Sequence, residues 1–116
     1  MSEMIFKILR PEEWAAFQIS GRFEGSPVDV QDGYIHFSTA EQTRETLAKH
    51  FADASRVAIL AVRDEDVAAD LRWEPSRGGA LFPHLYRPLM LEEIAASQEA
   101  DREAILAGDG PYSIDA

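Results

Sequence analysis

Three side chains that can take part in ligand binding or catalysis occupy alternate positions of one short stretch, Tyr34-Ile35-His36-Phe37-Ser38. Side chains alternate between the two faces of a β-strand, so Tyr34, His36 and Ser38 would share one face, and Ile35 and Phe37 the other. The apolar face can pack on a core. The other face carries a phenol, an imidazole and a hydroxyl, which together can orient a ligand, and the imidazole can also act as a general base.

A second stretch has the same pattern further along the chain. In Phe82-Pro83-His84-Leu85-Tyr86, His84 and Tyr86 lie on one side of an extended segment and Leu85 lies on the other. Pro83 restricts Phe82 to extended conformations and so stiffens the approach to His84. Proline also occurs in plain edge strands, so this feature alone does not separate a site from an edge. Together the two stretches predict one ligand site that contains both histidines.

The histidines also have other interpretations. His36 could be a half-buried histidine that bonds to backbone groups, because histidine is commonly intermediate in burial. Two histidines and a carboxylate are a known catalytic zinc set, which His36, His84 and Glu74 would match in type. However, the chain has no paired spacing such as H-E-x-x-H, and His50 lies apart in a predicted helix. We therefore predict no metal site.

A carboxylate beside a tryptophan gives a further candidate. Trp73 and Glu74 can form a pocket wall with a catalytic carboxylate. Alternatively, Trp73 lies in the core while Glu74 is solvated and paired with Arg72 or Arg77. We retain Glu74 as a candidate catalytic residue together with the two histidines.

A glycine-rich turn follows that tryptophan and carboxylate. Arg77, Gly78 and Gly79 could present a guanidinium and backbone N–H groups to a phosphate, although Gly-Gly is as common at a hairpin tip. Ser38 could act as a nucleophile, but Ser38-Thr39-Ala40-Glu41 matches a capping box, which gives its hydroxyl a structural task. The candidate ligand-binding residues are therefore Tyr34, His36, Ser38, Trp73, Arg77, Gly78, Gly79 and Tyr86.

The elements that must position these residues follow from hydrophobic periodicity and from breaker residues. Val57–Val62 has no polar residue, which is typical of a central strand buried on both faces. We expect strands over residues 4–9, 34–38, 57–62, 71–74, 82–86 and 90–96, helices over 11–21 and 38–51, a short helical turn over 64–70 and a loop over 21–33. An acidic tail follows from about residue 97, and its terminus is expected to fray. This pattern predicts a single small α+β domain over residues 1–116, with mixed or antiparallel sheets and two main helices.

Composition limits the possible functions. The chain has 116 residues, 46% of them apolar, and 11 Lys and Arg against 21 Asp and Glu, for a formal charge of −10. This surface repels phosphate backbones, so we expect no nucleic-acid binding. There is no cysteine, which excludes disulfides and thiolate chemistry. The N-terminus does not resemble a signal peptide, and Val57–Val62 is far shorter than the roughly 20 residues that span a bilayer. We expect a cytoplasmic protein without membrane contact.

The motifs together resemble the bacterial domain-of-unknown-function family 952, from about residue 6 to residue 89. The resemblance rests on Trp14, on the block from Asp32 to Thr39, on Glu41 and Gln42, on His50 and Phe51, on Arg72, Trp73 and Glu74, on Gly79, and on the block from Phe82 to Tyr86. The family has been grouped by fold with the ADP-ribosyltransferase superfamily, whose members bind NAD in a cleft between two small sheets.

The resemblance implies roles for several residues. His36 would be the histidine that holds the nicotinamide-side ribose, Tyr86 or Trp73 the aromatic group that stacks on nicotinamide, and Glu74 the carboxylate that supports the sugar cation. A carboxylate next to a developing oxocarbenium ion stabilises the transition state more than the ground state. Arg77 and the adjacent glycines could meet the pyrophosphate.

Two hypotheses of function follow, and a third remains open. The first is an enzyme similar to ADP-ribosyltransferases or NAD glycohydrolases, with NAD or an ADP-ribose-containing molecule as its substrate and with no certain cofactor. The second is a non-catalytic module that binds a small molecule or nucleotide derivative in a cleft lined by His36, Ser38, Glu74, His84 and Tyr86. The third is a protein-interaction domain whose acidic surface meets a basic partner.

Overall fold

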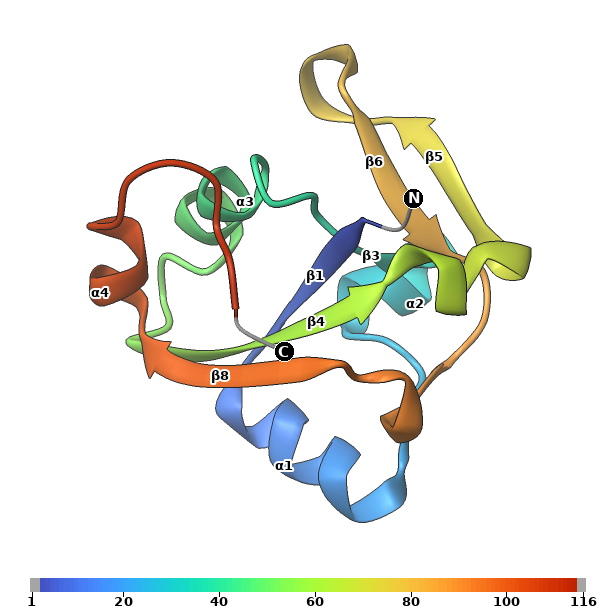
Figure 1. Ribbon diagram of the computed structural model, residues 1–116. Helices are drawn as coiled ribbons and strands as arrows, with labels where there is room; N and C mark the ends of the chain where they lie inside the picture. Colours follow the sequence, from blue (N-terminus) through green and yellow to red (C-terminus); the bar gives the residue numbers. More distant parts are fainter. Residues whose placement is uncertain (1–2, 115–116) are drawn as a thin grey trace.

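Within residues 3–114, which the computed structural model describes apart from the side chain of Arg77, the chain forms three antiparallel sheets (Figure 1). The strands are β1 (Met4–Leu9), β2 (Arg22–Phe23), β3 (Ile35–His36), β4 (Arg56–Arg63), β5 (Leu71–Pro75), β6 (Leu81–Leu85), β7 (Leu89–Met90) and β8 (Ala96–Asp101). The strand orders are β1-β4-β8, β2-β7 and β3-β6-β5. The predicted α+β class with antiparallel sheets is confirmed.

The helices cover the sheets and are mostly short. They are α1 (Pro11–Ser20), α2 (Pro27–Asp32), α3 (Thr43–His50) and α4 (Arg102–Leu106), with single 3₁₀ turns η1 (Asp64–Asp66), η2 (Ala68–Asp70), η3 (Arg77–Gly79) and η4 (Leu91–Glu93). The two longest, α1 and α3, are the two main helices that the sequence predicts. α1 begins at Pro11 and ends at Gly21, whose φ of 78° suits glycine.

β4 is the central strand of its sheet, as its apolar sequence predicts. It pairs with β1 on one side and β8 on the other, and its side chains from Val57 to Val62 are fully buried. Alternate residues enter two cores on opposite faces of the sheet. One, the first core, contains Leu60 and Val62 together with Trp14 and Phe17 of α1; the second core contains Ile59 together with Leu47 of α3.

The start of α3 differs from the prediction. Backbone hydrogen bonds in both directions hold Ser38 on Phe6 of β1, so Ser38 extends the sheet instead of capping the helix. The turn that follows contains the reciprocal bonds of a capping box one residue later. Thr39 N donates to Gln42 Oε1 over 3.0 Å, and Gln42 N donates to Thr39 Oγ1 over 3.3 Å. The helix then begins at Thr43.

The expected loop over residues 21–33 is largely ordered into secondary structure, so that prediction was wrong. β2 pairs with β7, and α2 fills most of the remainder. α2 has Pro27 at its first position and a capping box in which Ser26 N donates to Asp29 Oδ2 over 2.9 Å. Gly33, at φ 89°, ends the helix. The Ser-Pro-x-Asp sequence contains these helix-start features, which the prediction did not use.

The expected last strand was wrong, and the region predicted as an acidic tail contains regular structure; the fraying predicted for the terminus lies outside the described residues. The strand lies at β8, six residues later than predicted, and pairs along its length with β4 from Ala61↔Ala96 to Arg56↔Asp101. α4 follows, and Ile105 and Tyr112 are buried in the second core. β8 is an edge strand with mostly exposed side chains, so its contribution is backbone pairing, which leaves little hydrophobic pattern in the sequence.

β5 and β6 form a hairpin that projects from the body of the molecule, with η3 at its tip (Figure 1). This confirms the predicted strand at 71–74 and the hairpin tip at 75–79. β3 pairs with the other edge of β6 and completes the sheet.

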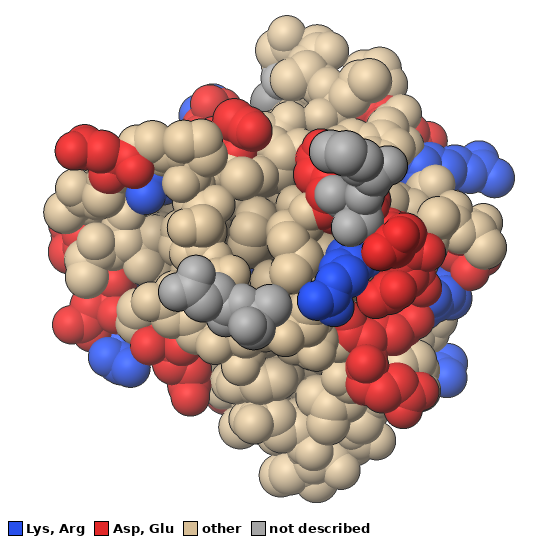
Figure 2. Space-filling view, viewed as in Figure 1, with Lys and Arg blue, Asp and Glu red and all other residues tan. Residues whose placement is uncertain are grey.

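The surface reflects the acidic composition. Figure 2 shows acidic side chains in a continuous band on the right of the view, with fewer basic groups beside it. None of the helices within residues 3–114 is both long enough and apolar enough to cross a membrane.

Candidate functional site

The two polar stretches of the sequence meet across the β3–β6 pair. The register aligns Ile35 with Leu85 and His36 with His84. Ile35 and Leu85 belong to the first core, so a shift by one residue would turn the histidines towards that core and the apolar pair away from it. Directly opposite residues share a face of an antiparallel sheet, and the two imidazole rings lie 5.5 Å apart between centroids. The predicted juxtaposition of the histidines is present.

His84 is almost completely buried, with 2% of its surface exposed. Its Nδ1 lies 2.8 Å from Oε1 of Glu74, and the Tyr86 hydroxyl donates to the same oxygen over 2.6 Å. An ionised carboxylate only accepts hydrogen bonds, so Nδ1 of His84 carries a proton. Its Nε2 makes no hydrogen bond with any residue of the described chain. In the neutral ring, Nε2 is therefore the atom able to accept a proton or a hydrogen bond.

The two hydrogen-bond donors, Tyr86 and His84, change the pKa of the Glu74 carboxyl group. The hydrogen bond from Tyr86, followed by that from His84, lowers the pKa of Glu74, and burial opposes the shift only in part. The same hydrogen bond raises the pKa of the Tyr86 phenol. Glu74 is thus a carboxylate at neutral pH, and it is half-buried rather than fully solvated.

His36 lies between two carboxylates. Its Nδ1 is 2.6 Å from Oδ1 of Asp29, and its Nε2 is 2.9 Å from Oδ2 of Asp32. The backbone N–H of His36 also donates to Oδ1 of Asp29 over 3.1 Å. Both ring nitrogens therefore lie within hydrogen-bond distance of a carboxylate oxygen. This arrangement fixes the ring in position and leaves neither nitrogen free for a ligand while both contacts persist.

Asp29 connects the site to the core and was not among the predicted residues. Its side chain is completely buried and forms an ion pair with Lys7, whose Nζ lies 2.9 Å from Oδ2. It also accepts a hydrogen bond from the Ser26 N–H and contacts the His36 ring. Burial alone raises the pKa of Asp29, but the hydrogen bonds and the charge of Lys7 outweigh it and lower the pKa to about 2. Lys7, itself 5% exposed, is the only polar residue in the apolar strand β1. That interruption was the sequence feature that could have indicated a buried ion pair.

Tyr34 covers the histidines. Its ring stacks on His84 at 4.1 Å between centroids, with 23° between the planes, and lies 4.7 Å from His36 and 5.2 Å from Tyr86. Burial and then the charges of Asp32, Glu74 and Asp29 raise the pKa of its phenol. Three carboxylates thus lie near this phenol. We call these residues the histidine cluster: Asp29, Asp32, Tyr34, His36, Glu74, His84 and Tyr86.

Other predicted residues lie apart from the histidine cluster. Ser38 is buried, and its hydroxyl is 2.9 Å from that of Thr46. Trp73 pairs with Pro83 and therefore lies on the opposite face of the sheet from Glu74 and His84.

The predicted phosphate-binding turn is at the hairpin tip, beyond the last pair of the ladder, Pro75↔Leu81. Gly78 and Gly79 have φ values of 69° and 83°, which supply the sharp turn. The side chain of Arg77 lies outside the described part of the structure. Arg72 is nearer the cluster, because its guanidinium lies 4.9 Å above the Tyr86 ring.

No group of three or more His, Asp or Glu side chains in the described part of the chain is arranged to hold a metal ion. Two surface cavities, of about 270 and 410 Å³, lie away from the histidine cluster. The larger lies between the start of α1 and the segment before β4, where Arg10 pairs with Asp53.

Comparisons with known proteins identify the family but no activity. The chain matches the family model described as "Protein of unknown function (DUF952)" over residues 8–97, which confirms the resemblance and extends it past residue 89. A crystal structure of protein CC0527 from Caulobacter crescentus is 53% identical, covers 84% of each chain and gives a TM-score of 0.78. The solution NMR structure of CC0527 is also 53% identical, covers 84% of this chain and 83% of that chain, and gives 0.72. No curated protein matches. The chain belongs to the DUF952 family.

Proposed function

We propose that the histidine cluster binds NAD or another ADP-ribose-containing molecule. The observation that carries the proposal is His84, an imidazole with one nitrogen fixed by Glu74 and the other without a hydrogen-bond partner in the described chain, at 2% exposure. The bond from Nδ1 to Glu74 leaves Nε2 as the acceptor of the neutral ring, so a ligand that donates a hydrogen bond can bind there. A ribose hydroxyl is such a donor.

The surroundings suit the oxidised nicotinamide ring. The ring centroids of Tyr34 and Tyr86 lie 5.2 Å apart. Flat rings stack well on aromatic faces of this kind. Burial, and after it the charges of Asp32, Glu74 and Asp29, raise the pKa of Tyr34, and these nearby carboxylates can attract a cation. The pyridinium of oxidised NAD is flat and cationic. Aromatic faces with nearby carboxylates attract such cations.

Glu74 would supply the chemistry in an enzyme of this kind. The bond between nicotinamide and ribose breaks, both of its electrons leave with nicotinamide, and the sugar carbon becomes an oxocarbenium ion. The Glu74 carboxylate, ionised because its pKa is lowered, stabilises that cation. Water or an acceptor hydroxyl then adds to the sugar carbon, and its proton passes to a base such as Nε2 of His84.

A binding module without turnover is the second candidate. It is favoured by the position of Tyr34, whose ring stacks on His84 and occupies the space above it. In this case ADP-ribose binds by displacing Tyr34 or beside it, and NAD stays intact.

The test combines binding and turnover on matched variants. We expect NAD and ADP-ribose to raise the melting temperature of the wild type, and chromatography to show release of nicotinamide from NAD. Glu74→Gln keeps an oxygen for the Tyr86 hydroxyl and removes the charge, so we expect it to bind ligand and lose turnover by about 100-fold or more.

The matched control is Glu99→Gln, an exposed glutamate on β8. We expect this variant to behave as the wild type. Binding without turnover in the wild type would support the module rather than the enzyme. Absence of binding by NAD and by ADP-ribose would refute both.

A further inference from the structure

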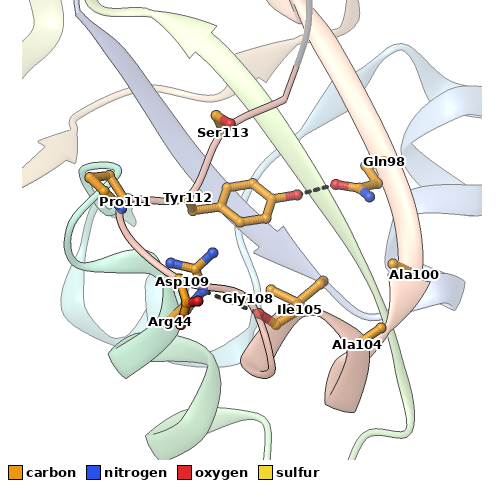
Figure 3. A pocket seen from close by; sticks show the side chains of 10 residues that line it. All are labelled: Arg44, Gln98, Ala100, Ala104, Ile105, Gly108, Asp109, Pro111, Tyr112 and Ser113. Atoms are coloured by element: carbon orange, nitrogen blue, oxygen red, sulfur yellow. Dashed lines mark hydrogen bonds between the residues drawn. The ribbon is translucent and has the colours of Figure 1, made fainter.

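The C-terminal segment lines an open cavity that is separate from the histidine cluster. This cavity, of about 270 Å³, lies between α3, β8, α4 and the segment 108–113 (Figure 3). Its walls are partly apolar, with Ala104, Ile105 and the ring of Tyr112, and partly polar, with Arg44 and Asp109. Most of the segment that lines it follows residue 97, where the match to the family ends. The volume is near the lower end of small-molecule sites, so an occupant would be small.

Arg44 is fixed at the wall of this cavity with most of its donors unused. Its Nε donates to the backbone oxygen of Ile105 over 3.1 Å, which anchors the guanidinium (Figure 3). A guanidinium has five N–H donors, and this is the only hydrogen bond that Arg44 makes within the described chain. The remaining donors belong to the two terminal nitrogens, whose planar fork fits two oxygens of one anion.

Comparable arginines in this protein all have a carboxylate partner. Among the part-buried arginines whose side chains the structure describes, Arg10 pairs with Asp53, Arg87 with Asp70 and Glu93, and Arg102 with Glu103. Arg44 is the part-buried arginine of the described set without such a pair. A part-buried charge without a counter-ion is unfavourable. The chain has 21 acidic residues, yet none in the described range forms an ion pair with Arg44.

Two neighbours of Arg44 bear on its guanidinium: Gly108 leaves space for it, and Tyr112 does not neutralise its charge. A Cβ atom on Gly108 would lie 2.6 Å from a terminal nitrogen of Arg44, so glycine leaves the room that the guanidinium occupies. Burial raises the pKa of Tyr112 to about 12, although the charge of Arg44 acts in the opposite direction. The phenol therefore stays neutral at physiological pH and, with its hydroxyl bonded to Gln98, does not serve as the counter-ion.

We propose that this cavity binds a small organic carboxylate. The carboxylate group accepts two hydrogen bonds from the terminal nitrogens of Arg44, and a short apolar body contacts Ile105, Ala104 and the Tyr112 ring. Asp109 lines the same cavity, and its negative charge disfavours a doubly charged phosphate relative to a singly charged carboxylate. The site is independent of the histidine cluster.

The test uses butyrate and benzoate as probes, with butyramide and inorganic phosphate for comparison, at constant ionic strength. We expect ligand-observed NMR to show saturable binding of at least one carboxylate to the wild-type chain and none of butyramide. Arg44→Gln should weaken that carboxylate by about tenfold or more, because it removes a charged bidentate contact. Arg63→Gln, at an exposed arginine at the end of β4, makes the same charge change and should leave binding unaltered.

A second variant keeps the proposal testable if Arg44→Gln is unstable. Ala104→Phe leaves Arg44 in place but fills the cavity, and it should abolish binding while circular dichroism shows a folded protein. The proposal is overturned if neither carboxylate binds, if phosphate binds and the carboxylates do not, or if a folded Arg44→Gln or Ala104→Phe binds them as the wild type does.

Discussion

At the scale of single residues, Asp29 unites the candidate site with the core. It is fully buried and accepts hydrogen bonds from Lys7, His36 and the N–H of Ser26. Breaking a buried ion pair by removing one partner is strongly destabilising, because the other charge stays buried and unpaired. His36 is therefore held by a residue that the fold itself requires, and its orientation is coupled to the stability of the domain.

The pKa of Asp29 predicts a pH dependence of stability. It falls from 3.8 to about 2 on folding. Because the pKa is lower in the folded state, ionised Asp29 adds about 2 kcal/mol to the free energy of unfolding at pH values above 3.8. This contribution is lost as the pH falls below 3.8 towards 2. We expect urea unfolding between pH 6 and pH 2 to show this loss in the wild type and to lack it in Asp29→Asn. Asp66→Asn, at an exposed aspartate, should retain it. An unchanged pH dependence in Asp29→Asn would contradict the assignment.

The Tyr86 hydroxyl is predicted to control the ionisation of Glu74. Its hydrogen bond is the largest cause of the lowered pKa of Glu74. We expect Tyr86→Phe to raise that pKa, measured by NMR titration of the Glu74 carboxyl carbon. The control is Tyr34→Phe, because Tyr34 contacts the cluster through its ring and makes no hydrogen bond to Glu74 in the described structure. A larger shift in Tyr34→Phe than in Tyr86→Phe would show that the hydrogen bond is not the main cause.

At the scale of elements, β8 and α4 complete the sheet and the second core. β8 supplies the second neighbour of β4, and Ile105 and Tyr112 cover the second core beside Phe6. We therefore expect deletion of residues 97–116 to abolish cooperative thermal unfolding, because β4 loses a strand and the second core loses its cover. Glu99→Gln, which changes an exposed side chain of β8 and keeps its backbone pairing, is the control and should melt as the full chain does. A truncated chain that melts at the same temperature as this control would contradict the role of β8.

The elements also show which predictions the sequence supported. The apolar run of β4 identified a central strand, and the alternating pattern around His36 and His84 predicted their shared face. Period-2 alternation also places Trp73 opposite to Glu74, so the sequence already separated two residues that we had assigned to one site. Asp29 and Lys7 were missed because a buried ion pair joins residues 22 positions apart. β8 was missed because backbone pairing at an edge leaves few apolar side chains in the sequence.

At the scale of the whole molecule, the formal charge of −10 and the acidic band in Figure 2 repel anions, so each proposed ligand needs local contacts that outweigh this repulsion. The two proposed sites differ in this respect. The histidine cluster places carboxylates beside aromatic rings, which suits a cationic ring, whereas the cavity at the C-terminal segment has a guanidinium without a carboxylate partner among the described residues. The two sites therefore predict different ligand selectivity in one small domain, and binding at one can be measured without saturating the other.

The most direct test of the central claim observes the His84 ring itself. Nitrogen NMR of ¹⁵N-histidine-labelled protein reports Nε2 of His84 separately once His84→Gln has assigned its signal. The account predicts that ADP-ribose and NAD shift this signal in a saturable manner, while butyrate leaves it unchanged because it occupies the other cavity. A His84 signal that neither nucleotide moves at saturating concentration would contradict the assignment of the histidine cluster as an ADP-ribose site.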